Sequence, residues 1–158
     1  MRWMNKSSIE QELARTGSLS YVTTGRSMQP FIRSGKDIVH LRAKQSGERF
    51  SKYDVILYWR RNAQKYVLHR IVKVLPDSYV LCGDNCLEKE PGITDEQVYG
   101  VLTGITRNGK AIRIHSKGYR LIIGFWYAVF APRVFAMRLR LRLKGIHPNK
   151  HSSGGGSL

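Results

Sequence analysis

Apolar and polar residues follow one another in short runs over residues 19–114, with turn residues between the runs. The runs at 38–41, 55–59 and 66–72 are rich in β-branched and aromatic side chains, which favours strands. Asn108-Gly109 joins two further runs and is a strong signal for a two-residue hairpin. No alternation of strand and helix patterns is visible. We therefore predict a mainly β fold, with a coiled, partly closed antiparallel sheet.

The pattern changes at both ends of the chain. A short helix is predicted before Gly17, which supplies a helix stop. The last residues are rich in Gly and Ser and predict a flexible tail. The resulting division is an N-terminal helix at 1–17, a β domain at 18–117, an apolar and basic helical segment at 118–146, and a tail at 147–158.

The segment at 118–146 combines an uncharged run at 121–132 with a run at 133–144 that mixes apolar and cationic residues. The uncharged run is shorter than the ~20 residues that cross a bilayer. Its composition suits an amphipathic helix that lies in a membrane interface, and Pro132 should break or kink that helix. The alternative is a helix that covers an apolar face of the sheet.

The chain carries 27 Lys and Arg against 11 Asp and Glu, a formal net charge of +16, and no acid follows Glu96. This charge favours nucleic acid, an anionic membrane surface or acidic peptides as partners. The sequence shows neither a stacked-aromatic RNA-binding motif nor a recognition helix, so we expect no nucleic-acid partner. We expect an anionic membrane surface, bound through residues 121–144. Because no export signal or N-terminal anchor is visible, a peripheral location on the cytoplasmic side is predicted.

Candidate chemistry starts at Ser27, which stands in a turn bounded by Gly25 and Pro30. A serine hydroxyl needs a base within hydrogen-bond reach to act as a nucleophile. Asp84 follows a glycine at a strand end. His69 lies within a β-branched run that has apolar residues on both faces, which predicts a central strand and a partly desolvated, neutral imidazole. Both residues are candidates to complete the site. Cys82 and Cys86 are too few for a disulfide framework and lack the partner histidines of a zinc site, so we expect free thiols. The alternative is a local disulfide between them that holds the Asp84 loop. No metal or cofactor is predicted.

Taken together, the motifs resemble, in order and spacing, those of type I signal peptidases. The resemblance covers about residues 18–106. Within the family, the chain looks most like the branch that uses a Ser-His pair, as in the endoplasmic-reticulum-type and archaeal enzymes, because His69 stands at the position of the general base. The matching residues are Gly25, Ser27, Met28 and Pro30; Tyr53, Asp54, Val55 and Ile56; His69, Arg70 and Ile71; Gly83, Asp84 and Asn85; and Gln97, Val98, Gly100 and Leu102.

The resemblance implies that Ser27 is the nucleophile, that His69 is the general base, and that Asp84 orients the imidazole. Glu90 stands near the offset of a second acid in the family, so the third member remains open between Asp84 and Glu90. The Ser27 amide is the implied oxyanion donor, with Gly25 keeping the approach open. The remaining two implied site residues, Met28 and Pro30, would shape the cleft and the turn.

These observations predict a serine endopeptidase that cleaves a leader or signal-like segment from a protein or peptide. Two alternatives from other classes are a non-catalytic scaffold of the same fold and a basic nucleic-acid-binding β-barrel. A self-cleaving repressor-type protease would need a Ser-Lys pair, but the nearby Lys65 and Lys73 occupy polar strand positions. Oligomeric state does not follow from the sequence.

Overall fold

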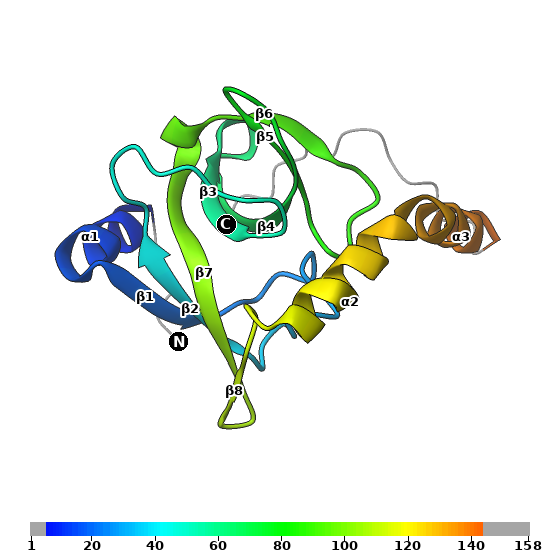
Figure 1. The fold of residues 1–158 in the computed structure, drawn as a ribbon, viewed down its shortest axis with the longest axis horizontal. Coiled ribbons are helices and arrows are strands. Elements are labelled where there is room, and N and C mark those ends of the chain that lie inside the picture. The colour runs from blue at the N-terminus through cyan, green and yellow to red at the C-terminus, as the bar shows by residue number, and fades with distance from the viewer. Residues whose placement is uncertain (1–5, 144–158) are drawn as a thin grey trace, which may run out of the picture.

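The computed structural model describes residues 6–143, so the predicted tail at 147–158 lies outside the described residues (Figure 1). In chain order the elements are α1 (Lys6–Thr16), β1 (Ser18–Val22), β2 (Ile38–Ala43), β3 (Val55–Arg60), η1 (Arg61–Ala63), β4 (Lys65–Val74), β5 (Tyr79–Cys82), β6 (Glu90–Ile93), η2 (Asp95–Gln97), β7 (Val98–Arg107), β8 (Lys110–Ile112), α2 (Lys117–Ala128) and α3 (Phe130–Leu143).

The strands form one antiparallel sheet in the order β1-β2-β7-β3-β4-β5-β6, and β8 pairs with β7 outside this path. The predicted mainly β, antiparallel architecture is therefore confirmed. The sheet is not closed, because β1 and β6 remain at its two ends. In Figure 1, β3 to β6 curve around one another, and β1, β2 and α1 extend to one side.

Two local predictions about chain direction are confirmed. Gly17, at a φ of 70°, ends α1, and its amide donates to the Leu13 carbonyl over 2.9 Å. Asn108 and Gly109, with φ values of 49° and 74°, form the tight connection between β7 and β8. Positive φ at both positions is what this type of hairpin turn requires.

The buried side chains form two clusters on opposite faces of the central strands. Leu57 and Leu68 belong to one cluster, whereas Ile56, Tyr58 and Ile71 belong to the other. Successive residues of a strand point to opposite faces, so β3 and β4 contribute to both clusters. The prediction that β4 is a central strand with apolar residues on both faces is confirmed.

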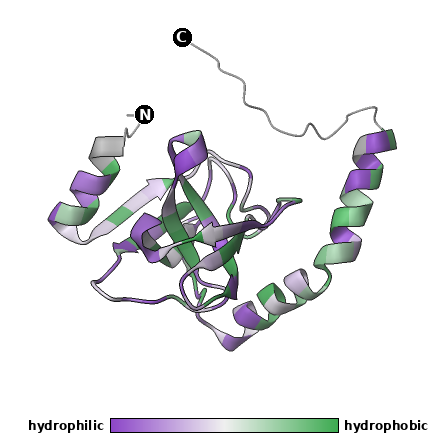
Figure 2. Cartoon of the chain, turned by 90° about the horizontal axis from the view of Figure 1, so that it is seen from above, coloured by the Kyte–Doolittle hydropathy of each residue, from purple (hydrophilic) through white to green (hydrophobic). Residues whose placement is uncertain are grey.

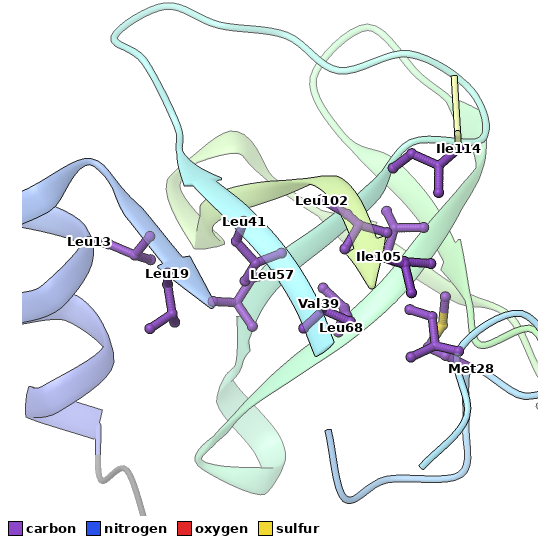
Figure 3. Close-up of a cluster of buried hydrophobic side chains, with 12 residues drawn as sticks. Leu13, Leu19, Met28, Val39, Leu41, Leu57, Leu68, Leu102, Ile105 and Ile114 are labelled. Carbon is purple, nitrogen blue, oxygen red and sulfur yellow. The ribbon is translucent and has the colours of Figure 1, made fainter. Parts of the chain in front are cut away.

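The loop between β1 and β2 is anchored at two points, Met28 and Asp37. Met28 is buried in the first cluster, and Figure 3 shows it at the margin of that cluster. At the far end, the fully buried carboxylate of Asp37 accepts hydrogen bonds from the Arg33 amide over 2.8 Å and from Arg107 Nη2 over 2.7 Å. Arg107 Nη2 also donates to the Phe31 carbonyl over 2.9 Å. A buried apolar side chain and a buried charge thus fix the path of the loop.

The C-terminal segment contains two helices where a single amphipathic helix was predicted. They separate at Val129, and the bend between α2 and residues Phe130–Arg140 is 58°. Pro132 has no N–H to donate to the Ala128 carbonyl, and its ring crowds that carbonyl, so the break falls just before α3. The predicted effect of Pro132 is confirmed.

Helix α2 packs on the β domain. Ile123 is buried, and the rings of Tyr119 and Trp126 contact the Phe31 ring edge-on at centroid distances of 6.0 and 5.4 Å. Among the described residues, no individual helix has the length and apolarity to cross a membrane; only the bent pair meets that test, by length and composition. Figure 2 shows α3 extending away from the β domain.

We expect Asp37→Asn to lower the free energy of unfolding near neutral pH by about 2 kcal/mol, because it weakens charge-assisted hydrogen bonds at a buried site. Burial opposes the charged form of Asp37, but the hydrogen bonds from Arg107 and Arg33 outweigh this effect and lower its pKa to about 2. The stabilisation is therefore present above the unfolded pKa of about 3.9 and is lost as the pH falls toward 2. Urea unfolding near neutral pH and at about pH 3 measures both effects.

The matched control is Asp77→Asn, which changes an exposed acid in the turn between β4 and β5. Equal destabilisation by the two substitutions would contradict the anchoring role of Asp37.

Candidate functional site

Ser27 lies at the start of the turns that follow β1. The Gln29 amide donates to the Arg26 carbonyl over 3.2 Å, and the Ile32 amide donates to the Met28 carbonyl over 2.9 Å. Ser27 is half-buried, while Met28 beside it is held in the core. Burial of Met28 therefore fixes the backbone next to Ser27, while the serine itself stays partly exposed.

Ser27 and His69 converge at Gly83, although the three residues come from separate parts of the chain. A Cβ added to Gly83 would lie 2.7 Å from the Ser27 carbonyl oxygen and 3.0 Å from His69 Nε2. The Asn85 amide also donates to the Ser27 carbonyl over 2.7 Å. The same Cβ would lie 2.5 Å from Cys86 Sγ, so a side chain at Gly83 would collide with the serine loop, the imidazole and this thiol. Within residues 6–143, no hydrogen bond joins the Ser27 hydroxyl to His69; it is the Ser27 backbone that lies near the imidazole.

The opposite side of the imidazole contacts a tyrosine. His69 Nδ1 lies 3.4 Å from the Tyr58 hydroxyl, which donates to Glu90 Oε2 over the shorter distance of 2.6 Å. Arg60 donates to the Tyr58 oxygen over 3.0 Å and pairs with the Glu90 carboxylate. The Tyr58 hydroxyl has one O–H, and its hydrogen bond to the Glu90 carboxylate uses it. The Tyr58 oxygen can therefore only accept from His69, and we infer that His69 Nδ1–H is the donor. Nε2 is then the free acceptor on the side of Gly83.

The imidazole is only 5% exposed, as its position in a central strand predicted. Burial lowers the pKa of His69 to about 4, and the positive charge of Arg60 contributes in the same direction. His69 is therefore neutral near pH 7, which is the form that can accept a proton.

Asp84 lies next to the convergence but is bonded to a different partner. Its carboxylate accepts two hydrogen bonds of 2.8 Å from the buried guanidinium of Arg70, and a third of 2.7 Å from the Tyr127 hydroxyl of α2. Among the described residues, no hydrogen bond joins Asp84 to the His69 ring. Arg70 follows His69 in β4 and projects to the other face of the strand, which takes the carboxylate away from the imidazole.

The remaining predicted site residues differ in their surroundings. Gly25 is exposed, and a Cβ there would meet nothing within 4 Å. Pro30 is also exposed, whereas Met28 is buried, so only Met28 contributes to the core. Glu90, the alternative acid, reaches His69 through Tyr58. The functional roles of these residues stay predictions.

The sequence reading missed Tyr58 and Arg60. The signal that would have found them is strand register: Ile56 pairs with His69, so Tyr58 lies two residues along β3 on the same face as the imidazole. Diagonal neighbours of this kind are within reach of long and aromatic side chains.

A hydrogen-bonded serine–histidine pair lies elsewhere on the sheet, between β1 and β2. Ser20 Oγ is 2.8 Å from His40 Nδ1, and the other ring nitrogen is 2.8 Å from Thr106 Oγ1. Ser20 and His40 pair directly across β1 and β2, which brings the hydroxyl and the imidazole together. Both ring nitrogens of His40 contact hydroxyls.

Two hollows lie apart from Ser27 and His69. One is a groove of about 570 Å³ whose lining includes His40, Gly104 and Ile112. The other is a small cavity of about 20 Å³ beside α2, with Arg70 and Ile123 in its wall. Neither is lined by the residues that converge at Gly83.

Both cysteines are free thiols. Burial raises the pKa of Cys82 to about 12 and also raises the pKa of Cys86. Within residues 6–143, no group of three or more His, Cys, Asp and Glu side chains is placed to hold a metal ion.

No protein-family model matches the chain, and no curated protein matches its sequence.

We expect ¹⁵N-resolved NMR of the histidine rings to show His69 neutral near pH 7, with its proton on Nδ1 and a pKa of about 4. Tyr58→Phe should remove the acceptor for Nδ1–H and increase the population of the Nε2–H form. His40→Gln assigns the resonances of the other paired histidine without altering the Tyr58 contact. An imidazole that titrates near its ordinary value of about 6.5 would contradict the burial argument.

Proposed function

We propose that this protein is a serine endopeptidase in which Ser27 is the nucleophile and His69 is the general base. The observation that carries the proposal is the approach of the Ser27 backbone and His69 Nε2 to the same point beside Gly83. A neutral imidazole with its second nitrogen bonded elsewhere supplies the free lone pair that such a base needs.

In the proposed reaction, the Ser27 hydroxyl oxygen attacks the carbonyl carbon of the scissile peptide bond while His69 Nε2 takes the hydroxyl proton. The tetrahedral intermediate collapses as the C–N bond breaks, and His69 returns the proton to the leaving amine. Water then attacks the acyl-enzyme, with His69 as base, to release the new carboxyl terminus and regenerate Ser27. The Ser27 amide is the proposed donor to the oxyanion.

Of the two acids that the sequence left open, the contacts favour Glu90 as the group that supports His69. Glu90 accepts the hydrogen bond from the Tyr58 hydroxyl, and the Tyr58 oxygen is then an acceptor for His69 Nδ1–H. The carboxylate would stabilise the imidazolium that forms during the reaction, with Tyr58 between them. Tyr58 and Glu90 are thus proposed as positioning residues, because neither touches the reacting atoms.

The substrate and the finer fold class rest on the resemblance of the ordered motifs to type I signal peptidases. We propose a coiled sheet of the signal-peptidase and repressor-protease type, and a protein or peptide substrate with a leader or signal-like segment. Small residues before the scissile bond are what the resemblance implies. The two alternatives, a scaffold and a nucleic-acid-binding module, require no reactive serine.

We expect Ser27→Ala to abolish peptide cleavage while leaving the free energy of unfolding within about 0.5 kcal/mol of wild type, because Ser27 is a half-buried loop residue. The matched control is Ser20→Ala, which removes the hydroxyl of the other serine–histidine pair and should retain activity. A peptide library with mass-spectrometric detection of products measures cleavage. Continued cleavage by Ser27→Ala would refute the assignment of the nucleophile.

We expect kcat/KM to rise through a pKa of about 4 and to stay level toward neutral pH, because only neutral His69 accepts the serine proton.

Glu90→Gln should lower kcat roughly a hundredfold, because the imidazolium loses its support. It should also move the acidic limb to lower pH, since the Glu90 charge raises the pKa of His69.

Asp84→Asn should act mainly on folding, lowering the free energy of unfolding by about 3 kcal/mol because Arg70 is left buried with a weakened partner. Measuring pH–rate profiles and urea unfolding for both variants distinguishes the proposed role of Glu90 in catalysis from that of Asp84 in folding. A folded Asp84→Asn protein with a hundredfold loss of kcat, alongside an active Glu90→Gln protein, would reverse the assignment.

A further inference from the structure

Helices α2 and α3 expose large apolar side chains that the β domain does not cover. Leu121, Phe125 and Phe135 are 74%, 70% and 70% exposed. We define the helical apolar face as Leu121, Ile122 and Phe125 of α2 with Phe135, Leu139 and Leu143 of α3. A concentration of exposed apolar residues on two consecutive helices usually marks an interaction site.

The orientation of this face on α2 is fixed by contacts on the other side of the helix. Ile123 is buried, and Trp126 Nε1 donates to the Asp84 carbonyl over 2.9 Å. The Tyr127 ring stacks on Tyr53 at a centroid distance of 6.1 Å. These contacts agree with the alternative from the sequence, in which the helix covers the sheet. They involve only one side of α2, however. The opposite side is left apolar and outward.

On α3, Phe135, Leu139 and Leu143 are four residues apart and therefore form one stripe along the helix. Arg138 and Arg142 lie one position before members of the stripe, and Arg140 lies one position after Leu139, so cations flank the stripe on both sides. Between residues 117 and 143 there are six Lys and Arg and no Asp or Glu. Arginine side chains can keep their charged heads at a polar boundary while their stems follow apolar surface.

We propose that the helical apolar face binds the surface of an anionic lipid bilayer, with its apolar side chains among the acyl chains and the α3 arginines at the headgroups. The α3 arginines form no ion pair with any residue in the described range 6–143. Apolar residues beside such positive charge match the interfacial region of an anionic membrane in both chemistry and charge. The positive charge supplies the preference for anionic lipid, and the apolar side chains supply the part of the binding that salt does not screen.

Membrane binding would also place the candidate catalytic site close to the lipid surface. Trp126 and Arg133 both donate to the carbonyl of Asp84, and Asp84 adjoins the glycine at which Ser27 and His69 converge. Helix α2, which carries half of the helical apolar face, is therefore hydrogen-bonded to the loop that contains Gly83 and Asp84. A bound protein would present that loop at a defined distance from the bilayer.

The test is flotation of the protein with vesicles of phosphatidylcholine alone or of a three-to-one mixture of phosphatidylcholine and phosphatidylglycerol. Wild type should float with the anionic vesicles and bind the neutral ones at least roughly tenfold more weakly. The triple variant Leu121→Ser/Ile122→Ser/Phe125→Ser should lose roughly tenfold or more in partitioning to both. Arg138→Gln/Arg140→Gln/Arg142→Gln should lose the preference for anionic lipid and its dependence on salt.

Two matched controls change the same chemistry elsewhere. Val74→Ser removes an exposed apolar side chain from the β domain, and Lys36→Gln/Lys73→Gln/Lys110→Gln removes three exposed charges there. Both should float like wild type. Repeating the assay with Ser27→Ala keeps the result independent of peptidase activity, since binding by that variant supports the membrane proposal whether or not the enzyme assignment holds.

Three outcomes would overturn the proposal. One is wild-type protein that stays in solution with anionic vesicles. Another is equal loss of binding in the triple lysine control, which would show that net charge alone drives association. The third is protein that resists extraction by alkaline carbonate, which would mean that the bent helix pair is embedded across the bilayer. If wild type fails to float and sedimentation shows a dimer that the α2 variant dissociates, the face is an interface between copies of this chain.

Discussion

The buried ion pair between Arg70 and Asp84 connects the parts of the protein on which the candidate site depends. Arg70 follows His69 in β4, and Asp84 follows Gly83 in the loop that contacts Ser27. The third donor of the guanidinium, Nη1, reaches the Tyr53 carbonyl over 2.9 Å. The same carboxylate accepts from Tyr127 of α2. One charge pair thus joins β4, which carries His69, to the Gly83 loop and to α2.

Burying two charges is costly, so the pair holds its position only because the remaining hydrogen-bonding groups are also satisfied. Burial alone would lower the pKa of Arg70, but the Asp84 carboxylate outweighs that effect and raises it. Tyr53 illustrates how much the surroundings impose, since a bulky residue rarely adopts a φ of 77°. Its amide donates to Ile71 over 2.7 Å, and its carbonyl accepts from Arg70, so both sides of the residue are held.

The parts of the fold that follow from local chemistry could be predicted from the sequence. Gly17, the Asn108-Gly109 turn and Pro132 act through backbone geometry within a few residues, and the structure has each feature where the sequence placed it. The burial of His69 followed from apolar residues on both faces of its strand. These predictions required no knowledge of what lies across the sheet.

The partners of the site residues could not be predicted in the same way, because they depend on register and on the alternation of side chains. The resemblance at Gly83 and Asp84 implied an acid beside His69, but the neighbouring Arg70 lies on the other face of β4 and binds that carboxylate. Tyr58 reaches the imidazole from β3 through a diagonal contact that only the pairing of β3 with β4 reveals. The docking of α2 on the Asp84 loop likewise depends on aromatic contacts with Phe31, distant in sequence.

The hydroxyl of Tyr58 has a consequence for how firmly the imidazole is directed. Burial and the hydrogen bond to Glu90 raise the pKa of Tyr58 well above its ordinary range, so the phenol does not ionise in mildly alkaline solution. The proton stays on the phenol and remains directed at the Glu90 carboxylate, so the phenol oxygen keeps the same lone pairs for Arg60 and His69. The acceptor for His69 Nδ1–H is therefore the same in mildly alkaline as in neutral solution, and Nε2 stays directed toward Gly83.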